Sequence, residues 1–529
     1  MERTTHGERN TYGIDPDVYD RRWWTLAVLC TSLMVVIIGN TALNVALPTL
    51  ARDLHASLTA QQWMVDGYAL VFAGMLFTGG AIGDRRGRKG ALQIGLLVFM
   101  TGSVFAAVSH SAGAVIAGRA IMGLGGAFVM PATLSILMNV FPAHERTKAI
   151  AVWAGIAGSA AAIGPIMSGF LLEHFWWGSV FLVNVPIISL ALIGGHLFVP
   201  TSRDPDQRPL DVAGALLSIA GVGALVYAII EAPNHGWASA QTALGFVVAA
   251  VLLCGFVSWE RHTPEPMLDM RYFADRRFSI GSASMAFVYF AMFGTMFLVT
   301  QYFQLVLGYG TLAAGVRGLP FAVMMMAVAP NTPRIAARIG ANRMVSAGLA
   351  LLGLGILWLT QFQAGTSYLL VGPVLAVIAF GMALTMSPLT ASIMSSVPPA
   401  RAGVGSAMND TSRELGGALG VAVLGSLVAS RFDQRIGPAI VGLSPAQHDQ
   451  ARASLAGALQ VARGLEGTAR DQLTVRAEDA FLSGFHLSAF VAASVAFVAS
   501  AVVWRLLPLR RESRLPLVAL DEEIVAPIG

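Results

Sequence analysis

Long apolar runs, separated by short polar connectors, dominate the sequence. Fourteen of these runs reach about 20 residues, the length at which an α-helix crosses a hydrocarbon core of about 30 Å. They begin near Trp23, Gln62, Gly90, Ala112, Ile150, Gly178, Val212, Thr242, Ile280, Gly315, Met344, Tyr368, Gly403 and Ala480. The pattern predicts an all-α polytopic membrane protein with 14 transmembrane helices.

Basic residues in the connectors orient these spans. Lysine and arginine collect in cytoplasmic loops, and the clusters at 21–22, 85–89 and 276–277 all lie on one side of the bilayer when the N-terminus is inside. A miscounted span would reverse this alternation for the rest of the chain, so we expect both termini to be cytoplasmic. Segment 430–479 places several arginines outside, which the rule permits because long segments cross regardless of charge.

The outer segment contains a helix signal of its own. Ser444-Pro445 is a typical helix start, and residues 446–467 follow it with an amphipathic pattern. We expect one capped helix that lies over the outer face, and we interpret it as a solvated loop helix rather than a partner-binding site.

Composition narrows the class of protein. Of the 529 residues, 55% are hydrophobic and only 12% are charged, whereas about 25% are charged in soluble domains. The pI near 9.3 is explained by basic residues in the cytoplasmic loops, so we expect no nucleic-acid partner. Cys30 and Cys254 lie in apolar segments and imply no disulfide framework. Lys89 and Lys148 are the only lysines among many arginines, which favours a GC-rich bacterium and its cytoplasmic membrane.

One stretch of the chain recurs further along it. The sequence MPATLSILMNVFPA at 130–143 aligns without gaps with SPLTASIMSSVPPA at 387–400. The match pairs span four with span twelve, so two six-helix pseudo-repeats, spans 1–6 and spans 9–14, flank two inserted helices. Such parallel repeats are a transporter architecture, with the substrate site between the halves. We expect a cytoplasmic tail at 1–22, an N-terminal half at 23–200, the inserted helices and flanking loops at 201–277, a C-terminal half at 278–507 and a cytoplasmic tail at 508–529.

The connector after the second span reads GAIGDRRGRKGAL. Its glycines predict a tight turn that presents a carboxylate beside a cationic cluster, and a short loop needs no acid for topology. The pattern resembles the signature loop of the major facilitator superfamily, G-x-x-x-D-R-x-G-R-[RK], and we interpret it as a gate rather than a positive-inside anchor. The expected gating residues are Gly80, Asp84, Arg85, Gly87, Arg88 and Lys89, with Arg413 from a later span.

Further motifs follow in the order expected for that superfamily. The fourth span reads VIAGRAIMGLGG, similar to the second family motif with Arg119 as its buried arginine, although Met122 replaces a glutamine. The fifth span reads AIGPIMSG and resembles the exporter motif, which implies a bend and close helix contact at Gly164, Pro165 and Gly169. Four other stretches resemble the fourteen-span drug:proton antiporter branch: NVALP at 44–48, FLVNVPI at 181–187, QLVLGYGTLAAGVRGLP at 304–320 and NDTSRELGGALG at 409–420.

The resemblance implies a proton-coupled secondary exporter of amphipathic drugs and antibiotics that works by alternating access. An exporter dedicated to one endogenous metabolite or lipid is an alternative. A non-transporting receptor or membrane enzyme is a weaker one, since the chain has neither an H-E-x-x-H metal site nor a G-x-x-x-x-G-K-[ST] loop. We expect no enzymatic activity, no cofactor and no metal. The expected partners are small amphipathic molecules, protons and the lipid bilayer, and the expected state is a monomer.

Charged residues inside a span cost roughly 3 kcal/mol each at the helix centre and are usually paired or functional. Asp66 and Arg119 lie at similar depths below the outer surface, so they are candidates for an ion pair and for proton coupling. The alternative is that Asp66 is interfacial. The antiporter branch often has an aspartate in span one where this chain has Gly39. The acid that carries the proton must therefore lie elsewhere, and Asp66 is one candidate.

Span thirteen holds the densest charge, in GSAMNDTSRELGGALGVAVLG. Asp410 and Glu414 lie four residues apart and share a helix face, with Arg413 to one side. Both acids are candidates for proton coupling, and Asp410 is favoured because Arg413 or a neighbouring helix can neutralise Glu414. In the superfamily, the corresponding helix packs its N-terminal end against the signature loop, which implies a contact with Asp84. Two roles stay open for the segment: a proton carrier or a latch between the halves.

Amide side chains in apolar spans are the candidates for contact with substrate. Asn40 and Asn44 lie four residues apart on the first span, and Gln301 and Gln304 close the ninth span, which is rich in aromatic residues and methionine. Amides can orient a ligand through hydrogen bonds, while aromatic and methionine surfaces adapt to varied apolar ligands. We expect these four residues to line the substrate cavity.

Overall fold

The computed structural model describes residues 15–202, 211–397 and 402–507, apart from some side chains, among them that of Asp84. Helices make up most of these residues, and no strand occurs among them. The longer helices are α2 (Arg22–Asp53), α3 (Leu58–Arg86), α4 (Arg88–Ala107), α5 (Ala112–Val140), α6 (Ala143–His174), α8 (Asn184–Phe198), α9 (Val212–His235), α10 (Ala240–His262), α11 (Arg276–Gln301), α13 (Leu319–Val328), α15 (Ala341–Trp358), α16 (Tyr368–Ser395), α17 (Ala402–Ile436) and α20 (Gly467–Leu506).

Shorter helices connect or extend the long ones. They are α1 (Pro16–Asp20), α7 (Ser179–Leu182), η1 (Met270–Ala274), η2 (Tyr302–Val306), α12 (Thr311–Arg317), η3 (Ala329–Asn331), α14 (Thr332–Ile339), η4 (Leu359–Gln361), η6 (Gly437–Ala439), α18 (Pro445–Ala453) and α19 (Leu455–Arg463). The π-helical η2 continues α11, and α12, α13 and η3 together form one membrane-length segment.

The long helices match the spans expected from hydropathy. In the described residues, 13 helical segments are long and apolar enough to cross a membrane, and they coincide with all but the fifth expected span. That span falls on α6, a helix of 32 residues that includes side chains outside the description. The all-α polytopic membrane fold is therefore confirmed, while the count of 14 spans stays a prediction. Residues 1–14 and 508–529 of the expected tails lie outside the described residues.

Serine and glycine set several of the helix boundaries. The side chains of Ser57, Ser111 and Ser239 accept hydrogen bonds from N–H groups in the first turns of α3, α5 and α10, which satisfies donors that a helix start leaves open. Gly87 between α3 and α4 has a φ of 119°, and Gly340 between α14 and α15 has a φ of 89°. Glycine tolerates these values best. Both expected repeats therefore use the same turn at corresponding connections.

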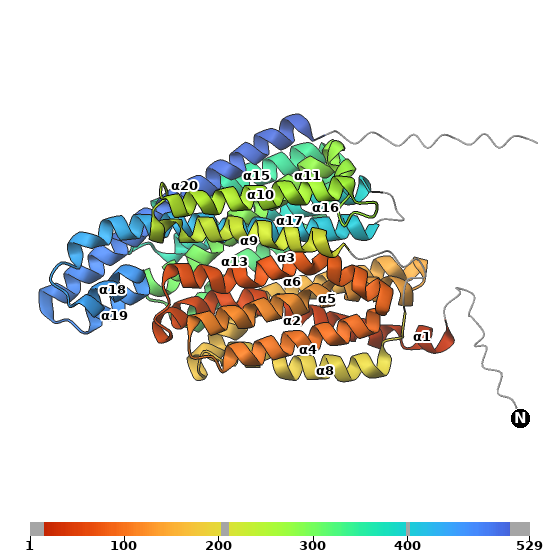
Figure 1. Ribbon diagram of the computed structural model, residues 1–529, viewed down its shortest axis with the longest axis horizontal. Coiled ribbons are helices and arrows are strands. Elements are labelled where there is room, and N and C mark those ends of the chain that lie inside the picture. Colours follow the sequence, from red (N-terminus) through yellow and green to blue (C-terminus); the bar gives the residue numbers. More distant parts are fainter. Residues whose placement is uncertain (1–14, 203–210, 398–401, 508–529) are drawn as a thin grey trace, which may run out of the picture.

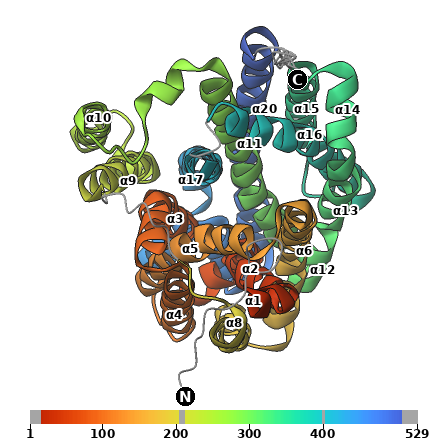
Figure 2. The same ribbon diagram turned by 90° about the vertical axis from the view of Figure 1, so that its right-hand side faces the viewer.

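The helices gather in two groups, α2–α8 and α11–α20, which the end-on view in Figure 2 separates most clearly. In the first group, α3 and α4 pack on α5, and α2 packs on α6; in the second, α11 packs on α17, and α15 packs on α16 and α20. The inserted helices α9 and α10 pack on each other, and α9 contacts both α3 and α17. The pairs α3 with α17 and α6 with α12 join the two groups.

The two groups are in close contact near the end of the bundle that carries α18 and α19, at the left of Figure 1, which we call the α19 end. There the hydroxyl of Thr311 donates to the carbonyl of Gly169 (3.1 Å), and Nε2 of Gln304 donates to the carbonyl of Val45 (2.8 Å). A Cβ atom on Gly315 would lie 2.5 Å from the carbonyl oxygen of Pro165. The backbones of α6 and α12 therefore touch, and this junction is closed.

The two longest of the described helices, α17 and α20, lead to the α19 end. α17 has 35 residues and α20 has 40, or about 50 and 60 Å at 1.5 Å per residue, against a hydrocarbon core of about 30 Å. The ends of the expected outer loop at 430–479 are therefore helical, because α17 continues to Ile436 and α20 begins at Gly467 rather than near Ala480. Polar residues at both boundaries continue the helices instead of ending them.

The single amphipathic helix expected in the outer segment is two helices. Ser444 and Gln447 form a capping box at the start of α18, as the sequence predicted. Ser454 then adopts an extended backbone (φ −172°, ψ 163°), and its side chain caps α19. Leu455 and Val461 of α19 are buried, and α19 contacts both α20 and α2. The interpretation as a solvated loop helix is therefore wrong for α19, which is packed.

Candidate functional site

The first span shows one partly exposed polar stripe. Asn40 and Asn44 lie on it with Ile37 and Thr41, while their neighbours on α2 are buried. The spacing of three and four residues places all four side chains on one helix face. Because α2 packs on α5, α6 and α8 within its own group and also contacts α11 of the other, it lies between the groups. Both asparagines stay accessible to a ligand in this conformation.

The predicted close contact at the exporter motif is present. A Cβ atom on Gly164 would lie 2.1 Å from the hydroxyl of Thr41 on α2, and one on Gly169 would lie 2.6 Å from the backbone of Leu312 at α12. Pro165 supplies the carbonyl that Gly315 approaches. At this motif, α6 therefore contacts α2 of its own group on one side and α12 of the second group on the other.

Arg119 is fully buried and is held by backbone rather than by Asp66. Its Nε donates to the carbonyl of Met64 (3.0 Å) and its Nη1 to the carbonyl of Gly39 (2.9 Å). Its guanidinium lies 4.4 Å from the centroid of the Tyr68 ring. The expected ion pair with Asp66 is wrong for this conformation. Met64 and Tyr68 share a face of α3, whereas Asp66 lies two residues from each, or about 200° around the helix at 3.6 residues per turn.

Asp66 instead lies on the face of α3 that meets α17. Gln62, one turn earlier on this face, donates through Nε2 to the carbonyls of Val421 (3.1 Å) and Ala422 (2.9 Å) and to the hydroxyl of Ser426 (3.3 Å). Asp66 is 0% exposed, and neither carboxylate oxygen has a hydrogen-bond partner among the described residues. The alternative of an interfacial aspartate is therefore wrong as well. An uncompensated carboxyl is buried at the junction of the two groups.

Arg413 pairs with Asp410 rather than with Glu414. Its Nη1 lies 3.5 Å from Oδ1 of Asp410, which also accepts from the amide of Asn409 (3.4 Å). The guanidinium lies 4.9 Å from the centroid of the Tyr289 ring on α11. These partners all belong to the second helix group, so Arg413 contacts its own group in this conformation.

Glu414 makes no hydrogen bond or ion pair with the described residues, but the charges of Arg413 on its own helix and Arg119 on a neighbouring one both act on it, in line with the expectation that favoured Asp410. Its Oε2 is buried and has no hydrogen-bond partner in the part of the chain that the structure describes. Arg119 and Tyr68 of the first group lie within electrostatic reach of this carboxyl. Asp66 is therefore the acid at the junction of α3 and α17 on which no described charge acts, whereas Glu414 is attracted by one arginine of each helix group.

The signature loop makes its described contacts within the first group. The N–H of Arg88 donates to the carbonyl of Ser202 (2.9 Å), and Nζ of Lys89 donates to the carbonyl of His196 (2.9 Å). Arg85 is exposed, and a Cβ atom on Gly80 would lie 3.4 Å from the side chain of Pro131. The side chain of Asp84 lies outside the description, so its contact with α17 stays a prediction.

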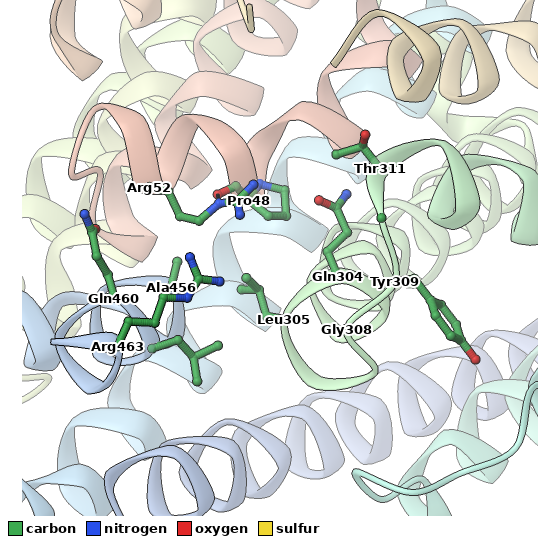
Figure 3. Close-up of a pocket in the computed structure, with 12 residues that line it drawn as sticks. Pro48, Arg52, Gln304, Leu305, Gly308, Tyr309, Thr311, Ala456, Gln460 and Arg463 are labelled. Atoms are coloured by element: carbon green, nitrogen blue, oxygen red, sulfur yellow. Dashed lines mark hydrogen bonds between the residues drawn. The ribbon is translucent and has the colours of Figure 1, made fainter. Parts of the chain in front are cut away.

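The two glutamines of the ninth span have different surroundings. Gln301 is 2% exposed, and its amide donates only to the carbonyl of Phe297 in its own helix (3.4 Å). It is a core residue in this conformation rather than a ligand contact. Gln304 bonds Val45 across the groups and lines a cavity at the α19 end together with Arg52 and Arg463 (Figure 3). The four expected substrate residues therefore do not converge on one place.

Sequence reasoning missed the neutral members of this junction. Gln62, Tyr68 and Tyr289 surround the charged residues but belong to no motif. One signal was available: Gln62 and Asp66 are four residues apart in an apolar run, as Asp410 and Glu414 are. Two polar pairs with helical spacing on different spans indicate facing surfaces.

Comparisons with known proteins agree with this architecture. The family model described as the Major Facilitator Superfamily matches residues 29–421. A multidrug efflux pump, LfrA of Mycolicibacterium smegmatis, is 36% identical and covers 91% of this chain and 96% of its own length. The tetracenomycin C resistance and export protein of Streptomyces glaucescens is 32% identical, with 95% of each chain covered. The methyl viologen resistance protein SmvA of Salmonella typhimurium is also 32% identical, over 92% of this chain and 98% of its own.

Solved structures agree on the fold. A bacterial homologue of the human lysosomal transporter Spinster, in an inward-facing and unoccupied conformation, has a TM-score of 0.60 at 18% identity, with 93% of this chain and 98% of the other covered. At that identity the likeness concerns the fold alone. Together with the family match over residues 29–421 and the relative at 36% identity, it identifies the chain as a member of the major facilitator superfamily, of its multidrug efflux type.

Proposed function

We propose that this protein exports amphipathic drugs in exchange for protons, by alternating access between a half at 23–200 and a half at 278–507, with the helices of 201–277 inserted between them. The names of three relatives state multidrug efflux, tetracenomycin C resistance and export, or methyl viologen resistance. We place the protein in a bacterial cytoplasmic membrane as a monomer, with both termini inside and the α19 end outside.

The observation that carries the coupling proposal is a pair of acids on α3 and α17. Asp66 is buried without a hydrogen-bond partner among the described residues, and Glu414 is attracted by Arg413 of its own group and Arg119 of the other. Burial of an ionised carboxylate without a partner costs several kcal/mol. Such a group therefore holds a proton or gains a partner in another conformation. Asp66 and Glu414 lie on helices of different groups, so a change in their ionisation acts on the contact between the groups.

Arg119 links Glu414 to the first helix group. It lies within electrostatic reach of Glu414, but its guanidinium is bonded to the carbonyls of Gly39 and Met64. Loss of the proton from Glu414 strengthens its attraction to Arg119 across the junction. We infer that this attraction favours one arrangement of the halves and that protonation releases it.

Asn40 and Asn44 are the proposed substrate contacts. Both are on the partly exposed stripe of α2, and Gly39, beside Asn40, gives its carbonyl to Arg119. A ligand that shifts α2 would therefore disturb the hydrogen bonds of Arg119. This link provides a route by which substrate and proton binding can oppose each other.

Transport in liposomes tests the proposal. Purified protein is reconstituted, a pH gradient is imposed, and a fluorescent amphipathic cation such as ethidium is followed. We expect ethidium to move against the proton flow and its gradient to collapse with a protonophore. No ethidium movement under any gradient would remove the exporter proposal, and movement that ignores the pH gradient would remove proton coupling alone.

Export of one compound class is a second candidate, supported by the relative whose name states tetracenomycin C export. The same liposomes distinguish the two. Competition of ethidium transport by chemically unrelated amphipathic compounds favours a multidrug exporter. Transport confined to one chemical class favours the dedicated exporter.

A further inference from the structure

A second candidate binding site lies at the α19 end, away from the buried acids. It is a cavity of about 300 Å³. Its walls come from the end of α2, the connection between η2 and α12, and one face of α19 (Figure 3). The first helix group, the second helix group and the outer segment therefore all contribute to it.

Two guanidinium groups give the cavity its charge. Arg52 extends into it from α2, and Arg463 extends into it from α19 (Figure 3). None of the described residues that line it carries a carboxylate. Two like charges that share a cavity repel each other, and an anion between them would replace repulsion with attraction.

Both arginines keep donors available for a ligand. Arg52 donates from Nε to the carbonyl of Pro48 (3.3 Å) and from Nη2 to the hydroxyl of Thr49 (3.2 Å), which anchors the side chain and uses only part of its five N–H donors. Arg463 is exposed and makes no side-chain hydrogen bond or ion pair with the described residues. By contrast, Arg452 of the same outer segment is paired with Asp433.

The position of Arg463 in α19 is not explained by helix stability alone. A cation in the last turn of a helix is favourable, and any exposed orientation would provide that. However, Arg463 lines the cavity with Gln460, Leu459 and Ala456, and this spacing forms one face of α19. The face carries a cation and an amide donor toward Arg52.

We propose that this cavity binds a phosphate-type oxyanion, either free phosphate or the headgroup of an anionic phospholipid. Paired guanidinium groups suit such oxyanions because each can donate two parallel hydrogen bonds. The amide of Gln460 adds a neutral donor, and Leu305 and Leu459 offer apolar wall beside the charges. Nothing in this site depends on proton coupling at α3 and α17.

Occupancy would stabilise the closed α19 end. Arg52 belongs to the first group and Arg463 to the outer segment, while Gln304 of the second group fixes the cavity wall through its bond to Val45. These elements separate if the end opens. A ligand that binds only when they are together stabilises that conformation by its binding free energy.

The test uses the full-length protein in nanodiscs. In discs of phosphatidylcholine, inorganic phosphate is titrated against chloride at equal ionic strength, and thermal unfolding and phosphate binding are measured. In a second arm, phosphatidylglycerol replaces part of the phosphatidylcholine. The variant is Arg463→Gln, and the matched control is Arg470→Gln, an exposed arginine of the same outer segment that does not line the cavity.

We expect ligand-dependent stabilisation in at least one arm, and a weakening of binding by about tenfold or more in Arg463→Gln, from the loss of charge-assisted hydrogen bonds. Arg470→Gln should match the wild type. A response to inorganic phosphate identifies a soluble ligand, and a response to phosphatidylglycerol alone identifies a lipid headgroup. No response in either arm, or equal weakening in both variants, would overturn the site. Because Arg463 is exposed, its substitution is not expected to disturb folding.

Discussion

The two junctions between the helix groups are built from different chemistry. Near the α19 end, α6 meets α12 through the backbones of Gly169 and Gly315 and one hydroxyl-to-carbonyl bond. Between α3 and α17, the contact includes Asp66, which is fully buried, and Glu414, whose Oε2 is buried. A junction of glycine backbone depends on shape, whereas a junction that contains acids depends on whether they hold protons. We infer that the first closes the protein and the second couples closure to protons.

The largest effect is expected from Glu414→Gln, which keeps the shape of the side chain and removes its charge. Under the coupling proposal, ethidium transport driven by a pH gradient should fall by more than about tenfold, because a single lost charge-assisted interaction of 1.5–3 kcal/mol has that size. Exchange of ethidium without a gradient should persist. Glu466→Gln, an exposed acid of the outer segment, is the control. Full gradient-driven transport in Glu414→Gln would exclude Glu414 as the carrier.

Asp410→Asn distinguishes a carrier from a latch on the same helix. Arg413 and Asn409 already compensate Asp410, so the variant should slow transport by less than Glu414→Gln and leave the dependence on the pH gradient intact. The measurement is the transport rate as a function of imposed pH difference. Loss of the gradient dependence in Asp410→Asn would instead support the role that the sequence alone favoured.

Gly315→Ala tests the closed junction. The new methyl group would lie 2.5 Å from the carbonyl oxygen of Pro165, and overpacking of this kind costs about 1–3 kcal/mol. The cost applies only when the end is closed, so the transport rate should fall by roughly tenfold, while coupling to protons remains. Gly365→Ala, where a Cβ meets open space, is the control. An unchanged rate in Gly315→Ala would show that this contact is not needed for closure.

Hydropathy predicted the helices of both junctions, but it did not predict which side chains meet across them. The depths of Asp66 and Arg119 were estimated well, since Arg119 reaches the carbonyl of Met64, two residues from Asp66. The depth of a residue gives its position along the helix axis but does not say which side of the helix its side chain is on. Asp66 lies two residues after Met64, which is about 200° around α3, so its side chain is directed away from Arg119.

The direct partner of Arg413 could have been predicted from sequence. Arg413 and Glu414 are adjacent, and adjacent residues of a helix do not face each other, whereas residues three apart do. That rule selects Asp410 as the partner of Arg413, as the structure does. The bonds from Gln62 to the carbonyls of Val421 and Ala422 were beyond sequence reasoning, because they depend on how two distant helices are placed.

Gln62→Leu should weaken the charged junction without touching its acids. The variant loses the hydrogen bonds to α17, and interhelical bonds inside membranes average about 0.6 kcal/mol, with a maximum near 1.7. We expect a lower unfolding temperature in detergent, by a few degrees, and transport that remains proton-dependent. Gln361→Leu, at an exposed position, controls for the change in polarity. A loss of proton dependence in Gln62→Leu would mean that Gln62 itself belongs to the coupling site.

The smallest effect is expected from Arg452→Gln, which removes the ion pair between α18 and Asp433 of α17. The two side chains are 55% and 37% exposed, and pairs in such surroundings contribute at most about 1 kcal/mol because water and salt screen them. The thermal unfolding temperature should therefore barely change, and the change should be smaller still at high salt. Transport should also be preserved, because α19 remains packed on α20 and α2. If transport fell while unfolding stayed the same, the position of α18 would matter to closure, and the α19 end would no longer be a junction of shape alone.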